Sequence, residues 1–396
     1  ACILDSNNMN HPTILAFSGH YLPGYKSGGP VQSVANIVDH LGAEFCFRVV
    51  ARDRDIGDTR PYPDIAVGKW VGVGRGQVLY LDAAEQTITR IARIMRETPH
   101  DAVYLNSFFD PRFTILPLLS RLLGMVPRRP FIVAPRGELS RGALGLKSLK
   151  KRSYIAAAKA LGLYDHVLWQ ASSNLEAEDI GKVFGANARV HIASNLPRAV
   201  LSGLDHPPRV VGQPLRVLFL SRISPMKNLQ FAIDVLARVR VPVEFRIIGP
   251  VSDAAYWTEC AQMIEALPPH IRVSYEGILP APEVPSAMAQ SDLFFLPTLG
   301  ENFGHAIIEA LGAGTPVLIS DQTPWQDLAA AGCGWVEPLS NPNSYAAHIE
   351  GMFGQAPRDH DLRRKAALRY AQIFTENSTN LEDNRALFQS AIGGEP

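Results

Sequence analysis

The chain has 396 residues, and its 38 Lys and Arg balance its 38 Asp and Glu. With 46% hydrophobic and 19% charged residues it is typical of a globular protein, which excludes a disordered or fibrous chain. At roughly 100 to 200 residues per domain, this length predicts two domains. No apolar run approaches the roughly 18 residues of a membrane-spanning helix, and no export signal is recognised, so we expect a cytoplasmic address.

Residues 1–196 alternate short apolar runs with longer amphipathic segments. This pattern predicts βα units and a parallel sheet covered on both faces. The segment Gly72–Gly76 is not a dinucleotide-binding fingerprint and is expected to be a loop. Strands are predicted at Thr13–Phe17, Phe45–Ala51, Ala102–Leu105, Phe131–Ala134 and Val167–Gln170, and helices near 30–41, 84–97, 112–123, 147–162 and 174–184.

A stretch rich in Pro and Gly follows Asn195 and indicates a linker, after which a second βα series begins. We therefore expect an N-terminal domain over 1–196, a second domain over 197–376 and a last helix over 377–396. Strands are predicted at Leu215–Leu220, Val243–Ile248, Ile271–Tyr275, Leu293–Leu296 and Val317–Ser320, and helices near 228–239, 253–266, 283–290, 304–313 and 343–353.

Two cations follow the first strand of the second series. Arg222 and Lys227 are five positions apart on a loop that opens the next helix. Ligands of open α/β sheets bind at the carboxyl ends of the strands, and the planar fork of Arg and the point charge of Lys suit a diphosphate near a helix N-terminus. Solvated surface cations are the alternative if this loop is considered alone.

A second polar loop follows the strand Leu293–Leu296. Glu301 and Asn302 lie there between two glycines, with Asn302 as the expected N-cap and Glu309 in the second turn of the helix. Glu301 can accept hydrogen bonds from sugar hydroxyls, and Glu309 can bind a ribose diol with its two oxygens. Each carboxylate alone could be an ordinary helix-start residue.

Together, the pair of Glu301 and Glu309 with Arg222 and Lys227 resembles the retaining glycosyltransferases of family 4, which have the GT-B fold. The resemblance implies two Rossmann-like α/β domains that face one another across a cleft, and a last helix, 377–396, that crosses back to the first domain. It also implies a nucleoside-diphosphate-sugar donor held by the second domain, without a metal ion or other cofactor. The catalytic residues would be Arg222, Lys227 and Glu301. Donor-binding residues in this domain would be Gly249, Ile278, Asn302, Phe303, Gly304, His305 and Glu309.

In the first domain the resemblance is carried by shorter motifs. Gly28 and Gly29 precede a helix, as in the glycine loop that approaches the donor phosphates, and Arg136 follows a predicted strand in a Pro-Arg-Gly segment. We expect these three residues to bind the donor. Where many relatives have a histidine, this chain has the segment Asn106–Asp110. The acceptor-binding residues are therefore expected to be Asn106, Asp110 and Glu138.

Two further features have competing interpretations. Asp53-Arg54-Asp55 matches the Asp-x-Asp metal motif of the other large glycosyltransferase fold, but the organisation into two sheets argues against it, so we expect no metal. The predicted helix 147–162 carries Lys147, Lys150, Lys151, Arg152 and Lys159. A basic amphipathic helix can bind an anionic membrane, and a solvated face is the alternative.

Charge is distributed unevenly along the chain. Residues 1–196 hold 23 Lys and Arg against 17 Asp and Glu, a net charge of +6, and the rest holds 15 against 21, a net charge of −6. A basic first half suits an acidic partner such as a phospholipid surface or a phosphate-bearing acceptor, unless the asymmetry is chance.

With the resemblance, which implies retention of the anomeric configuration, these observations predict a hexosyltransferase that moves a sugar from a nucleoside diphosphate, expected to be UDP, to a hydroxyl of a glycan or lipid-linked acceptor. Such an enzyme would act in polysaccharide or glycolipid synthesis, in the cytoplasm or at the inner face of the membrane, and would not bind nucleic acid. The alternatives are an enzyme similar to UDP-GlcNAc 2-epimerase, which needs no acceptor, and a two-lobed sugar-binding protein without catalysis.

Overall fold

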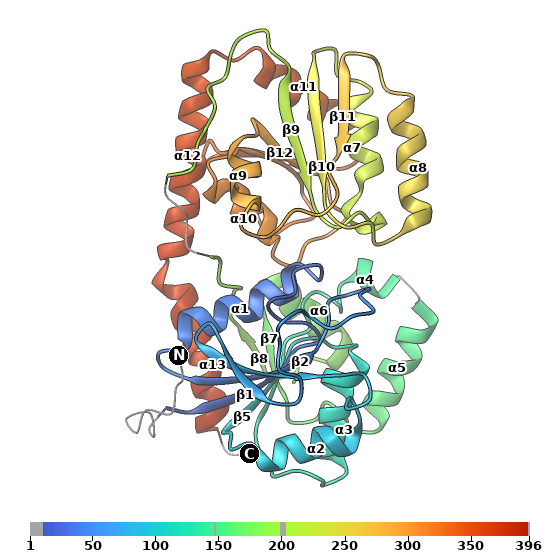
Figure 1. Cartoon of the computed structure of the whole chain (residues 1–396), viewed down its shortest axis with the longest axis vertical. Coiled ribbons are helices and arrows are strands. Elements are labelled where there is room, and N and C mark those ends of the chain that lie inside the picture. Colours follow the sequence, from blue (N-terminus) through green and yellow to red (C-terminus); the bar gives the residue numbers. More distant parts are fainter. Residues whose placement is uncertain (1–10, 146–147, 199–202, 395–396) are drawn as a thin grey trace. The chain divides into compact units, whose positions relative to one another are not determined.

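The computed structural model describes residues 11–145, 148–198 and 203–394, and it shows two compact units (Figure 1). Unit 1 comprises Ala1–Leu196 and Ser378–Pro396, and unit 2 comprises Pro197–Asn377. Each unit has its own largely parallel sheet with helices packed on it, and each sheet is the centre of its own hydrophobic core.

The sheet of unit 1 has eight strands in the order β3-β4-β2-β1-β5-β6-β7-β8. All neighbours are parallel except β3 and β4, which form an antiparallel hairpin. The prediction of a loop over Gly72–Gly76 is therefore wrong in part. The strand β3 ends at Val73 and β4 begins at Gly76, so only the two residues between them form the turn, and Gly74 there has a left-handed φ. The strands are β1 (Thr13–Phe17), β2 (Cys46–Arg52), β3 (Trp70–Val73), β4 (Gly76–Leu81), β5 (Ala102–Leu105), β6 (Phe131–Val133), β7 (Leu168–Ala171) and β8 (Val190–Ile192).

Helices cover both faces of this sheet, as the βα pattern predicts. One cluster of buried apolar side chains includes residues of α2, α5 and α6, and a second includes residues of α1 and α13. The helices are α1 (Gly29–Leu41), α2 (Ile88–Glu97), α3 (Leu116–Leu122), α4 (Arg141–Gly145), α5 (Ser148–Ala160), α6 (Asn174–Phe184) and α13 (Ser378–Gly393), and a π-helical turn spans Pro111–Ile115.

The last helix, α13, belongs to the core of unit 1 (Figure 1). The ring of Phe388 is fully buried and lies 5.5 Å from Phe45, 5.5 Å from Phe47 and 5.3 Å from Tyr104 between ring centroids. Asn384 donates a hydrogen bond of 2.7 Å to the carbonyl of Ser194 beyond β8. The helix α13 therefore covers part of one face of the first sheet.

The sheet of unit 2 has six parallel strands in the order β11-β10-β9-β12-β13-β14. The strands are β9 (Leu215–Leu220), β10 (Val243–Ile248), β11 (Ile271–Tyr275), β12 (Leu293–Leu296), β13 (Val317–Ser320) and β14 (Gly334–Glu337). The helices are α7 (Leu229–Leu236), α8 (Ala254–Glu265), α9 (Val284–Ala289), α10 (His305–Gly312), α11 (Pro342–Phe353) and α12 (Pro357–Glu376), and a 3₁₀ turn spans Pro225–Lys227. No helix among the described residues combines the length and the apolar character that a membrane span needs.

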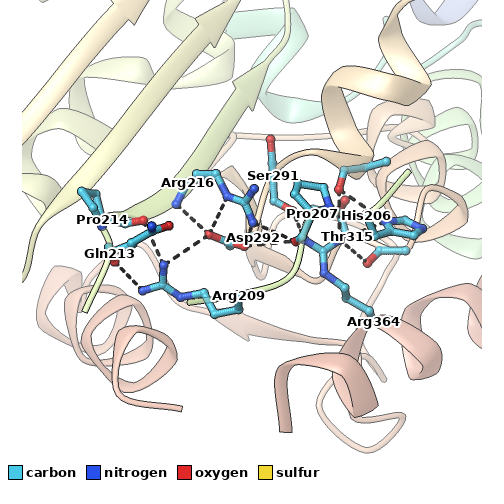
Figure 2. A network of polar contacts seen from close by, with 12 residues as sticks. His206, Pro207, Arg209, Gln213, Pro214, Arg216, Ser291, Asp292, Thr315 and Arg364 are labelled. Carbon is cyan, nitrogen blue, oxygen red and sulfur yellow. Dashed lines mark hydrogen bonds and ion pairs between the residues drawn. The ribbon is translucent and has the colours of Figure 1, made fainter. Parts of the chain in front are cut away.

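A buried carboxylate holds the linker and α12 against the amino ends of two strands (Figure 2). Asp292, fully buried before β12, accepts hydrogen bonds of 2.6 and 3.1 Å from the guanidinium of Arg216, and Arg209 and Arg364 lie at 3.9 and 3.6 Å. Burial acts to raise the pKa of Asp292, but the hydrogen bonds and charge of Arg216 outweigh it and hold the pKa below its ordinary value. The network thus lies at the amino ends of the strands, whereas ligands of open α/β sheets bind beyond the carboxyl ends.

Candidate active site

The loops after β9 and β12 are joined to one another at the carboxyl edge of the sheet. The two strands are neighbours. Asn228 donates from its side chain to the carbonyl of Pro297 at 3.0 Å, and the Met226 carbonyl accepts hydrogen bonds from the Leu299 amide at 2.8 Å and the Thr298 hydroxyl at 3.0 Å. These bonds fix the relative position of the predicted diphosphate loop and the predicted sugar loop.

The joined loops place Lys227 against Glu301. The ammonium of Lys227 donates to Oε1 of Glu301, and the two side chains are only 15% and 10% exposed. The other carboxylate oxygen of Glu301 forms no hydrogen bond within the described part of the chain. Arg222, half-buried on the same loop, forms no ion pair with any described residue. The loops thus present one paired and one unpaired cation and a carboxylate oxygen.

Glu309 lies in the second turn of α10. Removal of water from its surroundings raises the pKa of Glu309 to about 7, and the charge of Arg198 acts in the opposite direction. The helix is capped by Gly304, whose φ of 82° is left-handed, and no side chain caps it. The expectation that Asn302 is the N-cap is therefore wrong, because glycine adopts this conformation without the steric cost that a side chain brings. Asn302 lies two residues ahead of the cap.

The side chain of Phe303 points into the core of unit 2. It is 5% exposed, and its ring lies 5.3 Å from that of Trp325 and 5.9 Å from that of Phe374. Trp325 also donates from its indole nitrogen to the Phe303 carbonyl at 2.5 Å. His305, 8% exposed, packs 4.7 Å from the same ring. These contacts hold the Asn302–His305 segment rigid, and Phe303 can offer a ligand only its backbone.

The end of β10 approaches the loop after β9 so closely that only glycine fits. A Cβ on Gly249 would lie 2.0 Å from the carbonyl oxygen of Ser221, and its φ of 142° is one that other residues avoid. The Gly249 amide donates to the Gly277 carbonyl at 2.7 Å, and the next residue, Ile278, is 39% exposed. The two predicted base-binding positions therefore lie on adjoining loops.

In unit 1, the glycine loop between β1 and α1 is held by the acidic motif. Asp55 accepts hydrogen bonds from the amides of Tyr25 and Lys26 at 2.7 and 2.9 Å, and Lys26 forms a 2.5 Å ion pair with Asp58. The loop leads to Gly28, left-handed at φ 65°, and α1 begins at Gly29. Asp55 of the Asp-x-Asp motif therefore positions this loop through its backbone. The described residues contain no cluster of three or more His, Cys, Asp or Glu that could hold a metal ion.

Two carboxylates, Asp110 within the loop and Glu138 outside it, hold the predicted acceptor loop Asn106–Asp110 in place. Glu138 accepts hydrogen bonds from the amides of Phe108 and Phe109 at 2.6 and 2.9 Å. Burial raises the pKa of Glu138, against the effect of these bonds. Asp110 caps the π-helical turn and forms a two-bond pair with Arg52 at 2.9 and 3.1 Å. Both carboxylates are therefore occupied by donors of their own unit.

Arg136 lies where the loops after β5, β6 and β8 meet. It donates to the carbonyl oxygen of the Asn195 side chain, to the Tyr104 hydroxyl at 2.5 Å and to the Asn106 side chain at 2.7 Å. Tyr104 in turn donates to Gln170 at 2.5 Å. The sequence did not single out Tyr104, which lies within an apolar strand, or Asn195, whose strand β8 is three residues long and was missed.

Residues 206–369, within unit 2, match the family described as Glycosyl transferases group 1. The phosphatidyl-myo-inositol mannosyltransferases of Mycobacterium leprae and Mycobacterium tuberculosis (strain CDC 1551 / Oshkosh) are 28% identical over 156 residues and 34% identical over 163 residues. These segments cover 37% and 39% of this chain and 40% and 41% of the relatives. The O-antigen chain mannosyltransferase B of Escherichia coli is 26% identical over 136 residues, 33% of this chain and 35% of the relative. The chain thus aligns with less than half the length of each of these three relatives.

Solved structures match the whole chain. HepE of Anabaena, in complex with UDP and glucose, has a TM-score of 0.71 at 17% identity, and sucrose-phosphate synthase of Thermosynechococcus elongatus has 0.73 at 15%. Each match covers 97% of this chain and 100% of the other. At these identities the likeness shows the fold, and it is the fold predicted from the sequence: two Rossmann-like units, the GT-B fold. Within it, residues 206–369 are the part that matches the glycosyl transferases group 1 family.

Proposed function

We propose that the chain is a retaining glycosyltransferase, which moves a sugar from a UDP-sugar to a hydroxyl of a glycan or lipid-linked acceptor in polysaccharide or glycolipid synthesis. The observation that carries this proposal is the pairing of Lys227 with Glu301 on two joined loops at the carboxyl edge of the sheet. The family match of unit 2 supports transfer, the names of the mannosyltransferase relatives support such acceptors, and the UDP bound to HepE supports the nucleotide.

The diphosphate binds Arg222 and Lys227. A charge-assisted hydrogen bond to phosphate is among the stronger polar contacts in proteins, and both cations are partly shielded from water. The diphosphate competes with Glu301 for Lys227, so the ion pair loosens as the donor binds. Stabilising the charge that develops on the leaving diphosphate is then the main contribution of the two cations to the rate, without a metal ion.

The sugar and the ribose bind the two glutamates. Glu301 keeps one oxygen for a sugar hydroxyl while the other bonds Lys227, and Glu309 accepts hydrogen bonds from the ribose diol. The rigid Asn302–His305 segment borders the sugar with its backbone, and Gly249 and Ile278 border the base. With no carboxylate assigned as a nucleophile, the leaving diphosphate itself helps remove the proton of the acceptor hydroxyl on the same face of the sugar.

Unit 1 supplies the acceptor side of the reaction and the glycine loop. Gly28 and Gly29 approach the donor phosphates through their backbone, since neither has a side chain. Asn106 contacts the acceptor, because its side-chain nitrogen has no partner among the described residues. Asp110 and Glu138 position that loop through the donors they already bind.

The test uses nucleotide sugars with and without an acceptor extract. We expect thermal stabilisation by a UDP-sugar, followed by transfer to a lipid or glycan fraction, and loss of turnover in Lys227→Ala and Arg222→Ala at saturating donor. Wild-type turnover in both variants would refute the roles of these cations. Conversion of UDP-GlcNAc to UDP-ManNAc without an acceptor would select an epimerase, and binding without any conversion would select a sugar-binding protein.

We also propose that α5 brings the chain to an anionic membrane surface. Lys150 and Arg152 are exposed there, and Leu149 is 82% exposed beside them. Lys151 and Lys159 are less available, because they donate to the carbonyls of Ala143 and Val183, and Lys147 lies outside the described residues. The double variant Lys150→Gln, Arg152→Gln should sediment less with vesicles rich in anionic lipid. Equal sedimentation of the variant and the wild type would remove the proposal.

A further inference from the structure

Among the described residues, only neutral oxygens accept hydrogen bonds from the guanidinium of Arg136. Its partners are two side-chain amides, Asn106 and Asn195, and the hydroxyl of Tyr104. Tyr104 is fully buried, and the two Asn residues are 4% and 2% exposed. Three nearly inaccessible acceptors therefore set the orientation of one charged group, and none of them removes its charge.

No carboxylate in the described part of the chain forms an ion pair with Arg136, although charged groups of that kind are near. Glu176 of α6 bonds the residue next to Arg136, because its oxygens accept hydrogen bonds from the amide of Gly137 at 2.6 Å and from the amide and hydroxyl of Ser172, each at 2.8 Å. Glu138 is occupied by the Asn106–Asp110 loop. A partly buried cation with no counter-ion is costly, unless a ligand supplies the negative charge.

Two donors of the same cluster have no partner. The side-chain nitrogen of Asn106 and Nε of Arg136 are buried, and neither forms a hydrogen bond within the described residues. Buried donors in native structures are nearly always paired, so an unpaired one calls for a ligand. The backbone indicates the same, because Arg136 has a φ of 56°. A residue with a Cβ is strained in this left-handed region, and such strain gathers at functional sites.

We propose that Arg136, Asn106, Asn195 and Tyr104 form an anion-binding site, and that this site holds a phosphate or carboxylate group carried by the acceptor. Arg136 contributes the charge, Asn106 contributes a further N–H, and Asn195 and Tyr104 hold the guanidinium. The assignment to the acceptor rests on the proposed function, and it moves Arg136 from the donor side, where the sequence resemblance placed it. The substrate class is then an acidic acceptor, such as a glycan or lipid with a phosphate or a uronic acid.

The experiment measures binding of inorganic phosphate and of acetate to the full chain by calorimetry, with and without saturating UDP. UDP keeps the probe away from Arg222 and Lys227. Arg136→Gln removes the charge, and Asn106→Asp keeps the guanidinium but places a carboxylate beside it. Arg128→Gln, an exposed residue of the same unit, is the matched control for the loss of one positive charge.

We expect one of the probes to bind the wild type and Arg128→Gln in the presence of UDP, and its dissociation constant to rise about tenfold or more in Arg136→Gln and Asn106→Asp. Asn106→Asp is the decisive variant. If Arg136 had a purely structural role, the new carboxylate beside it would leave binding of the probe unchanged, and the resistance of the variant to urea would be unchanged or greater. Glucose 1-phosphate in solution and phosphatidic acid in vesicles of neutral lipid then show whether the anion belongs to a soluble or a lipid acceptor.

Equal affinity of Arg136→Gln and Arg128→Gln would overturn the proposal, as would no binding of either probe by the wild type. Displacement of the probe by UDP would return Arg136 to the donor and overturn its assignment to the acceptor. If the chain binds no UDP at all, the proposed function fails, while the comparison of variants without UDP still decides whether the anion site exists.

Discussion

Glu309 gives a proton-linked test of donor binding. Its pKa is raised to about 7, so at pH 6 roughly nine-tenths of the chains carry it protonated. A ribose diol donates hydrogen bonds, and the ionised carboxylate is the stronger acceptor. Donor binding at pH 6 should therefore release close to one proton, and the apparent affinity should be about tenfold lower than at pH 8, since one unit of pKa corresponds to about 1.4 kcal/mol.

The assay is calorimetry with UDP-glucose in buffers of different ionisation enthalpy. UDP-glucose is preferred to UDP because its diphosphate is esterified at both ends and has no proton that titrates near neutral pH. The variant Glu309→Gln should bind without proton release, and Glu265→Gln, an exposed glutamate of α8, should behave as the wild type. Proton-free binding by the wild type at pH 6, or release that persists in Glu309→Gln, would refute the assignment of Glu309 to the ribose.

The same carboxyl makes the stability of the free chain depend on pH. In the unfolded chain Glu309 ionises near 4.5, and in the folded chain near 7. The folded state therefore holds the extra proton between these values, and its contribution to stability is present below pH 4.5 and lost as pH rises through 7. The free energy of unfolding should fall by at most about 3 kcal/mol over this range because of Glu309. Urea titrations of Glu309→Gln at pH 5 and 8 should lack this loss.

Three further predictions concern unit 2. Lys227→Ala should weaken binding of UDP-glucose by tenfold or more, measured by calorimetry, because it removes a charge-assisted contact. Unchanged affinity would contradict the proposed diphosphate site. In urea unfolding, Gly249→Ala should cost about 3 kcal/mol or more and Gly277→Ala only about 1, because both have positive φ but only the first meets a carbonyl, and equal losses would contradict the close approach. Asp292→Asn should cost about 3 to 5 kcal/mol, and Asp234→Asn, in an exposed pair, less than about 1; similar small losses would show that the buried network is not needed.

Most strands that the sequence predicted correctly lie inside their sheets, and the edge strand β11, whose side chains are mostly exposed, was predicted as well. In unit 2 the predicted bounds of β9 and β12 agree with the structure, because parallel central strands are continuous apolar runs. Of the missed strands, β3, β8 and β14 are three or four residues long and lie at the edges of their sheets, where half-exposed side chains give no such run. The missed strand β4 is longer and mostly buried, but it begins at Gly76, within the glycine-rich segment that was predicted to be a loop. The helix α12 was missed because its first two turns are mostly charged.

Some residues of the candidate site could likewise be proposed from the sequence, and others could not. Loops after central strands identified Arg222, Lys227 and Glu301, because ligands of such sheets bind at strand ends. The contact between Lys227 and Glu301 joins residues 74 positions apart, so no local pattern could indicate it. The surroundings of Arg136 depend on Tyr104 and on a loop after a missed strand, and only the assembled sheet brings them together.

The placement of α13 makes unit 2 an insertion within unit 1. During synthesis, the segment that buries Phe45, Phe47 and Tyr104 leaves the ribosome after the whole of unit 2. All strands of unit 2 are synthesised before α13, so unit 2 can fold first. Until α13 has been synthesised, one apolar face of unit 1 stays uncovered. A chain that lacks residues 377–396 would therefore lose the fold of unit 1 and keep the fold of unit 2.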